Sequence, residues 1–316
     1  MSPTHSPSAD PAQDRDLDPH GGAWVRADEP LLPRALRRTL SLPASLYAHR
    51  ALWIAGARRE LRARLSGTLL GRLWPVVGPL ALFGVYYALF ARAFGMGFPG
   101  LGPEASRATG VWLFLGVVTW SAFAESLGRG TAAFVERGEL LKRAAFPAEV
   151  LPFQAIVAQH LLLAAGLCAF VVVVSLAGLW PPPGAGLLWT PLLLCLQMLF
   201  VLGLTLASAT LHAFLRDTAH AVGLLTTLWM FATPIFWIPS ERVLPGVGPF
   251  LPWLAWNPMH AFVSCWRHAL MPGAPAEGFT TDFGTSLATA GLWTAGALCV
   301  GGFLFSLGLR RLPDEV

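Results

Sequence analysis

Few side chains in this sequence could do chemistry, and the first question is whether the chain binds ATP. A phosphate-binding loop needs a glycine, a lysine and then serine or threonine, because the lysine reaches the nucleotide phosphates. Lys142 is the only lysine, and it lies between Leu141 and Arg143. The chain therefore has no such loop. If ATP drives this protein, a separate chain must supply the ATPase.

Cysteines, histidines and carboxylates are also poorly placed for metal binding or catalysis. His160 and His212 are isolated, and we interpret His160 as hydrogen-bonded between helices. Glu125 and Arg129 are four residues apart and can pair on one helix face. A proton-coupled pump would need carboxylates at mid-membrane depth, and none is found there. The cysteines are far apart and favour packing over a metal or redox site: Cys168, Cys195, Cys265 and Cys299. We expect neither enzymatic activity nor a cofactor.

The composition is that of a membrane protein. Hydrophobic residues make up 54% of the chain and charged residues only 13%, with a mean hydropathy of +0.56. Soluble domains are about one quarter charged. A soluble fold could not cover this much apolar surface, which excludes a soluble enzyme.

Charge-free stretches predict an all-α integral membrane protein with six transmembrane helices, since each can cross a hydrocarbon core of about 30 Å. The long stretch from Val150 to Leu215 must be divided near Pro181–Pro183, because proline cannot continue a helix. Residues 243–266 also lack charge, but their four prolines make a continuous helix unfavourable. The expected spans are 73–94, 109–131, 148–179, 187–215, 218–239 and 283–309.

The flanking segments predict the orientation. Residues 1–44 are rich in Pro, Asp, Ser and Arg and read as a disordered cytosolic tail. Residues 45–65 form an Arg-rich amphipathic helix, which either lies in the membrane interface or serves as a plain positively charged anchor. Six spans place most basic residues, and both termini with 312–316, in the cytosol, as the positive-inside rule requires. The exceptions are Arg92, Arg107, Arg242 and Arg267.

Two short charged segments between spans could receive force from a cytosolic motor, or could equally be solvated turns. One joins the second and third spans at 136–143, and the other is Arg216-Asp217 between the fourth and fifth. The candidate coupling residues are Glu136, Arg137, Leu140, Lys142, Arg143, Arg216 and Asp217.

Aromatic residues recur on single faces of three spans. The chain has 13 Trp and 20 Phe but only 3 Tyr. Flat rings can stack on the apolar faces of sugars, although helix packing and interfacial aromatic belts would use the same residues. The candidates for a substrate path are Tyr87, Trp120, Phe123, Trp229, Phe236 and Trp237.

Several motifs in order resemble permeases of type 2 ABC exporters for polysaccharides, the family that exports O-antigen, capsule and teichoic acid. They lie within about residues 46–311 and are RLSGTLLGRLW at 64–74 with Pro79, WLFLG at 112–116, FPAEVLP at 146–152, TPIF at 233–236 and NPM at 257–259. Arg216-Asp217 also matches. Leu65 departs from the pattern, since the family often has an aromatic residue there.

The resemblance implies six spans, an N-terminal interface helix, short re-entrant helices between spans five and six, and location in the cytoplasmic (inner) membrane. It implies a homodimer with two ATPase subunits, with 136–143 and Arg216-Asp217 facing the ATPase. The expected cargo is a lipid-linked polysaccharide that moves from the cytosolic to the outer side. Export of a drug or small lipid is the alternative. Membrane lipids are expected partners, and nucleic acid is not.

Overall fold

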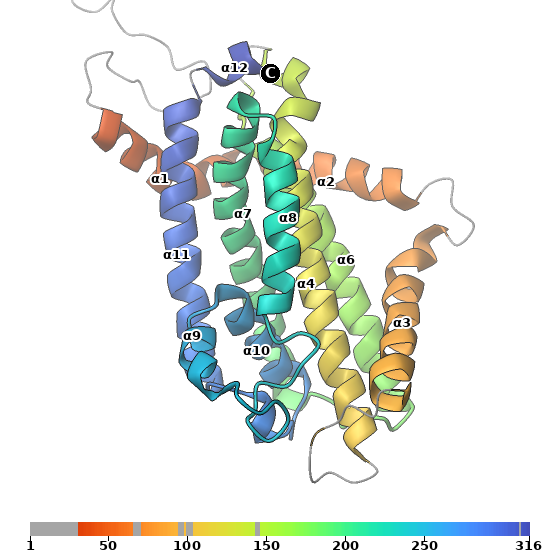
Figure 1. The fold of residues 1–316 in the computed structure, drawn as a ribbon. Coiled ribbons are helices and arrows are strands. Elements are labelled where there is room, and N and C mark those ends of the chain that lie inside the picture. Colours follow the sequence, from red (N-terminus) through yellow and green to blue (C-terminus); the bar gives the residue numbers. More distant parts are fainter. Residues whose placement is uncertain (1–30, 66–70, 94–97, 99–103, 143–145, 310) are drawn as a thin grey trace, which may run out of the picture.

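The computed structural model describes residues 31–65, 71–93, 98, 104–142, 146–309 and 311–316, and all regular elements among them are helices (Figure 1). This part of the chain therefore has the expected all-α class. The α-helices are α1 (Leu31–Ala48), α2 (Arg50–Leu65), α3 (Trp74–Tyr86), α4 (Ala105–Glu136), α5 (Gly138–Leu141), α6 (Val150–Leu176), α7 (Thr190–Phe214), α8 (Thr218–Ala232), α9 (Leu251–Ala255), α10 (Pro258–Leu270), α11 (Phe283–Gly308) and α12 (Leu312–Glu315).

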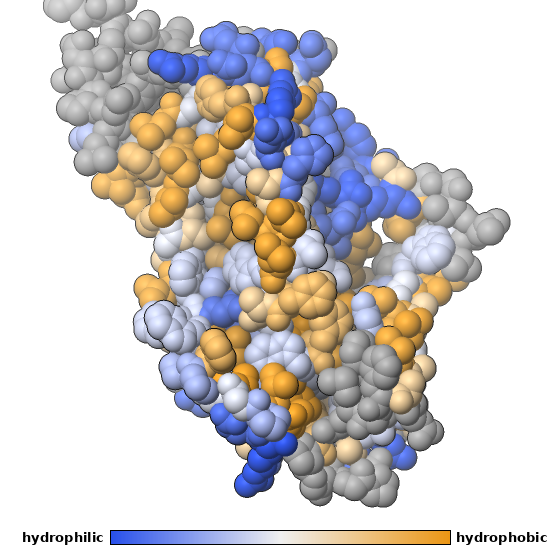
Figure 2. Space-filling model, viewed as in Figure 1, coloured by the Kyte–Doolittle hydropathy of each residue, from blue (hydrophilic) through white to orange (hydrophobic). Residues whose placement is uncertain are grey.

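Within the described ranges, four helical segments are long and apolar enough to cross a membrane: Ala105–Glu136, Val150–Leu176, Gly184–Phe214 and Ala276–Gly308. Val77–Leu89 and Thr218–Ala232 are shorter apolar helices at the places where the first and fifth spans were predicted. The chain is thus a multi-pass membrane protein, and the count of six spans stays a prediction. Figure 2 shows apolar surface along the bundle and hydrophilic residues gathered near α12 and at the opposite end.

The amino-terminal part differs from the expectation of a disordered tail over 1–44. Helix α1 begins at Leu31, while residues 1–30 lie outside the described part. Leu42 and Leu46 of α1 are buried, and Thr39 lies where a Cβ on Gly302 of α11 would be only 2.6 Å from its methyl group. Helix α1 therefore packs on α11. The arginine and serine residues between its apolar positions made this packing hard to predict from the sequence.

Close helix packing sets the framework around α7 and α11. A Cβ atom on Gly301 would lie 1.8 Å from the carbonyl oxygen of Gly203, and one on Gly203 would lie 2.3 Å from the backbone of Ala297. Small residues at membrane helix contacts allow backbones to approach in this way. Helix α4 packs against α6 and α7 with most of its residues buried. The charged residues towards the carboxyl end of α4 are thereby fixed relative to the bundle.

The proline-rich segment after α8 returns into the bundle as α9 and α10, and Asn257 connects it to α8. The Asn257 side-chain oxygen accepts the backbone N–H groups of Met259 (3.0 Å) and His260 (3.3 Å), which caps α10. It also accepts the indole N–H of Trp229 at 2.9 Å. The Asn257 amide donates to the hydroxyl of Thr233 at 3.1 Å. This explains why asparagine precedes the proline that starts α10.

Replacing Asn257 with alanine is expected to lower the free energy of unfolding by about 1–2 kcal/mol, the usual cost of losing a helix cap. Asn257→Asp keeps the acceptor and loses only the two bonds that the amide donates, to the Thr233 hydroxyl and the Ala232 oxygen, so it should cost less. Thermal unfolding in detergent measures both variants. Equal stability of Asn257→Ala and the parent chain would contradict this account of the cap.

Candidate functional site

The predicted coupling residues lie at one end of the bundle. Glu136 ends α4, Arg137 links it to α5, and α5 contains Leu140. Glu136 and Lys142 are exposed, whereas Arg137 and Leu140 are half-buried. Of the others, Arg216 and Asp217 are exposed between α7 and α8, and Arg143 lies outside the described residues.

Residues 312–316 contact both charged segments. Val316 packs directly on α5, where a Cβ atom on Gly138 would be 3.1 Å from the carbonyl carbon of Val316. The Arg216 guanidinium donates to the backbone oxygen of Glu315 at 3.3 Å, and Leu312 is fully buried. Figure 1 shows α12 beside these helix ends. This contact could not be predicted from the sequence, because it joins three segments that are distant along the chain.

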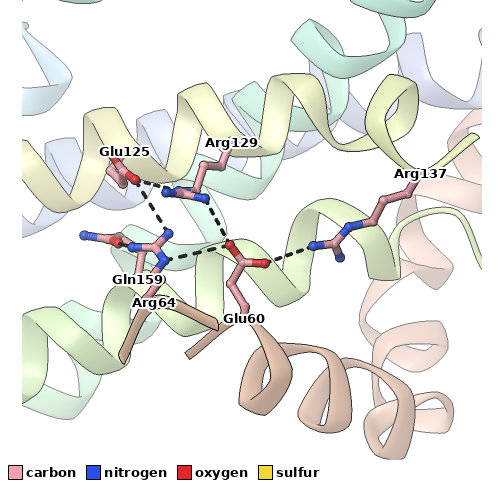
Figure 3. Close-up of polar contacts among 6 residues, drawn as sticks. All are labelled: Glu60, Arg64, Glu125, Arg129, Arg137 and Gln159. Carbon is pink, nitrogen blue, oxygen red and sulfur yellow. Dashed lines mark hydrogen bonds and ion pairs between the residues drawn. The ribbon is translucent and has the colours of Figure 1, made fainter. Parts of the chain in front are cut away.

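A cluster of charged side chains joins α2 to α4 beside these segments, and we call Glu60, Arg64, Glu125, Arg129 and Arg137 the ion-pair network (Figure 3). Glu60 lies near its centre and is 13% exposed. Its carboxylate accepts Arg129 Nη1 at 3.1 Å and Arg137 Nη2 at 2.9 Å, and Arg64 Nε lies 3.8 Å away. Glu60 thereby connects α2 to both the middle and the end of α4.

Glu125 and Gln159 complete the surroundings of Arg64. Arg64 Nη2 lies 3.6 Å from Glu125, and Arg64 donates to the Gln159 side-chain oxygen at 2.5 Å. The predicted pair of Glu125 and Arg129 on one helix face is present. Burial and the nearby Arg129 cation lower the pKa of Arg64, and the carboxylates oppose this change. The half-buried Arg64 guanidinium is therefore compensated by two carboxylates and by the Gln159 amide.

A groove of about 750 Å³ lies between α4 and α8, next to the ion-pair network. Trp120 and Ser121 line it at one end, and Glu125, Arg129 and Glu136 line it towards the coupling segments. Its other wall comes from α8, in which no described residue is buried. The groove thus combines an aromatic end, a charged end and a wall of exposed apolar helix.

The structure brings three of the six aromatic candidates together. Phe123 lies 5.2 Å from Trp120 and 5.3 Å from Trp229 between ring centroids. Phe123 has no exposed surface, and Trp120 is 4% exposed but lines the groove. In this conformation, packing within the subunit therefore explains why an aromatic residue stands at position 123, where Phe123 lies. Trp120 is in a position to meet a molecule in the groove.

The other three aromatic candidates lie elsewhere. Tyr87 packs beside Gly110 of α4, where a Cβ atom would be 2.4 Å from the tyrosine ring. Phe236 contacts Tyr86 at 5.8 Å between ring centroids. The indole N–H of Trp237 donates to the Phe231 oxygen at 3.3 Å. Phe236 nevertheless packs against the same hydrophobic core as Trp120, Phe123 and Trp229.

Arg267 is a buried cation whose importance the sequence analysis missed. Its side chain is fully buried in α10 and donates to the backbone oxygens of Trp112 (3.1 Å), Pro234 (2.8 Å) and Ile235 (3.3 Å). The guanidinium lies 3.5 Å from the Trp112 ring centroid. A Cβ atom on Gly116 would be 2.6 Å from Arg267 Nη2, so only glycine leaves room. Arg267 could have been identified from the sequence, because it is a single charge beside an otherwise uncharged stretch.

The histidine and cysteine positions give no sign of metal chemistry. His160 Nδ1 lies 2.9 Å from the Ile156 oxygen of its own helix, so the expected hydrogen bond between helices is not found among the described residues. In the same part of the chain, no group of three or more His, Cys, Asp and Glu residues could hold a metal ion.

Comparisons with known proteins agree with one another. A family model described as "ABC-2 type transporter" matches residues 51–271. An "O-antigen export system permease protein RfbA" of Myxococcus xanthus is 32% identical over 235 residues, which cover 72% of this chain and 83% of that protein. Two proteins of the same name from Klebsiella pneumoniae are 25% and 24% identical, each covering 70% of this chain and 81% of their own length.

Proposed function

The chain belongs to the ABC-2 type transporter family as a membrane permease without an ATPase domain, and from this premise we propose its cargo. We propose that it carries a lipid-linked polysaccharide of the O-antigen, capsule or teichoic-acid type from the cytosolic to the outer side of the cytoplasmic membrane. ATP hydrolysis by a separate subunit drives the step. The relatives named as O-antigen export permeases support this at the level of the family.

The groove between α4 and α8 is the observation that favours a polymer over a small molecule as the cargo. From Trp120 to Glu136 its α4 wall extends about 24 Å at 1.5 Å per residue, which exceeds the length of most small molecules. A polymer must slide, so strong hydrogen bonds along the path would each cost about 1 kcal/mol or more to break. An aromatic face such as that of Trp120 offers weak contact of low specificity. Export of a drug or small lipid is the second candidate.

The complete transporter is proposed to be a homodimer with two ATPase subunits and both termini in the cytosol. Leu224, Leu225 and Leu228 of α8 are each about 60% exposed, and they lie on the helix that forms one groove wall. A second copy that packs on α8 would cover this apolar surface and close the groove. The arginine distribution supports the orientation.

We further propose that residues 136–143 and Arg216-Asp217 contact the ATPase. Replacing Glu136 and Lys142 together with alanine should lower export about fivefold or more, within the range of typical coupling energies. Both side chains are exposed, so the free energy of unfolding should change by less than about 0.5 kcal/mol. Arg137 is left unchanged because it binds Glu60.

Export and ATPase binding by the folded double variant are the quantities to measure. Arg242→Ala is the matched control, since that side chain is 77% exposed outside the coupling segments. Normal export by the double variant would count against the coupling role.

The substrate path is proposed to include Tyr87, Trp120, Phe123, Trp229, Phe236 and Trp237, of which Trp120 is the sharpest test because it lines the groove. Trp120→Leu keeps the apolar character of the position and removes the flat ring. We expect less surface polysaccharide at an unchanged amount of folded permease. If the amount of permease falls in parallel with export, packing is the better explanation.

Deleting the gene for this chain in its host tests the cargo. We expect surface polysaccharide to disappear and lipid-linked glycan to accumulate inside the cell. Unchanged surface polysaccharide together with increased sensitivity to a drug would favour the second candidate instead.

A further inference from the structure

A second cavity, of about 400 Å³, lies between α2, α6 and α7 and shares no lining residue with the groove. Its walls are mostly apolar and include Trp53 of α2, Leu161 of α6, and Leu194 and Met198 of α7. The indole N–H of Trp53 is already bonded to the Leu46 oxygen at 2.9 Å. Two side chains of the lining, Arg58 and His160, remain able to bind a polar group.

Arg58 differs from the other arginine of α2 that faces protein. Arg64 is held by Glu60, Glu125 and Gln159. Arg58 is exposed, and no hydrogen bond or ion pair joins it to any residue that the structure describes. A guanidinium at the edge of an apolar cavity is suited to an anion attached to an apolar body.

His160 supplies the second polar group and limits the ligand further. It is 2% exposed, and its Nδ1 must donate to the Ile156 oxygen, 2.9 Å away, because a carbonyl only accepts. In the neutral ring Nε2 is therefore an acceptor, and it has no partner among the described residues. Leaving a buried acceptor unpaired is unfavourable. A ligand with a hydroxyl donor would satisfy it, whereas a plain hydrocarbon chain would not.

The cavity also lies beside apolar surface that suits lipid chains. Leu161 on its edge is 51% exposed, and Leu192, two residues before Leu194 in α7, is 45% exposed. Both belong to helices long and apolar enough to span a membrane. Arg-rich helices such as α2 bind anionic lipid surfaces.

We propose that this cavity is a binding site for phosphatidylglycerol from the leaflet in which α2 lies. The lipid phosphate contacts Arg58, a hydroxyl of its glycerol headgroup donates to His160 Nε2, and its chains lie along Leu161 and Leu194. This ligand is separate from the exported cargo, and the site does not depend on what that cargo is.

The test uses the full chain in lipid nanodiscs with photoactivatable lipids, and the crosslinked peptides of α2, α6 and α7 are counted. Phosphatidylglycerol should crosslink more than phosphatidylmethanol, which carries the same single negative charge but has no hydroxyl in its headgroup, and more than phosphatidylcholine. Arg58→Gln should lower crosslinking of phosphatidylglycerol about fivefold, the effect of one basic side chain at an anionic surface. Arg59→Gln is the matched control, because Arg59 is exposed on α2 but does not line the cavity.

His160→Leu should reduce the crosslinking of phosphatidylglycerol to that of phosphatidylmethanol, and should leave the crosslinking of phosphatidylmethanol unchanged. If that variant does not fold, the comparison of Arg58→Gln with Arg59→Gln decides. Equal crosslinking of phosphatidylcholine and phosphatidylglycerol would overturn the proposal, as would equal effects of the two arginine substitutions. Equal crosslinking of the two anionic lipids would overturn the role of His160.

Discussion

Arg267→Leu is expected to lower the free energy of unfolding by about 3 kcal/mol. The substitution leaves the backbone oxygens of Trp112, Pro234 and Ile235 without the guanidinium in the protein interior. Each orphaned acceptor costs about 1–3 kcal/mol. Part of this total is offset, because the variant no longer has to bury a cation away from water. The segment after α8 should lose its attachment to α4 first, because Arg267 joins the two.

Two further variants separate this bond from general packing. Arg267→Lys keeps the charge but cannot reproduce the planar fork, so it should recover only part of the loss. Gly116→Val introduces a side chain where a Cβ would already be 2.6 Å from the guanidinium, and it should destabilise the protein even with Arg267 present. Thermal unfolding in detergent measures all three. A parent-like midpoint for Arg267→Leu would show that the buried bonds contribute little.

Glu60→Ala is expected to lower export more than about tenfold, within the range of coupling between distant sites. Glu60 is the residue through which α2 meets both Arg129 and Arg137. Without it, Arg64 and Arg129 share Glu125 and Arg137 loses its ion pair, so that repulsion among the arginines weakens the contact of α2 with the end of α4. The arginines are 18–46% exposed, so water screens much of this repulsion. The free energy of unfolding should therefore fall by only about 1–2 kcal/mol.

The matched control for this prediction is Glu104→Ala, which removes an exposed carboxylate at the other end of α4. The conservative variant Glu60→Asp keeps a carboxylate at this position and should retain part of the export that Glu60→Ala loses. Export must be compared at equal amounts of folded permease. Equal export by Glu60→Ala and the parent chain would show that the ion-pair network does not couple ATP hydrolysis to export.

Properties that depend on local sequence could be predicted well. Apolar length is visible in any charge-free stretch, so Val150–Leu176 lies within the expected range 148–179. The pair of Glu125 and Arg129 follows from helical spacing alone. The asparagine and proline that begin α10 also carry a local capping signal.

Properties that depend on distant segments could not be predicted. Glu60 and Arg137 are 77 residues apart, and no periodicity connects them. Arg267 bonds to backbone oxygens, which have no sequence identity, and so its partners are invisible before folding. Helix α1 was missed because arginine and serine residues separate its apolar residues in the sequence, and the contact with α11 that buries Leu42 and Leu46 forms only in the folded chain.

Reconstitution of the permease with its ATPase subunit tests the central claim most directly. Both proteins are placed in liposomes that carry a lipid-linked polysaccharide in one leaflet, and an enzyme that modifies only accessible glycan measures its arrival in the other. The account predicts transfer that requires ATP and both subunits and that Glu60→Ala largely abolishes. If the glycan stays in its original leaflet while the complex hydrolyses ATP, the polysaccharide is not the cargo and the account is wrong.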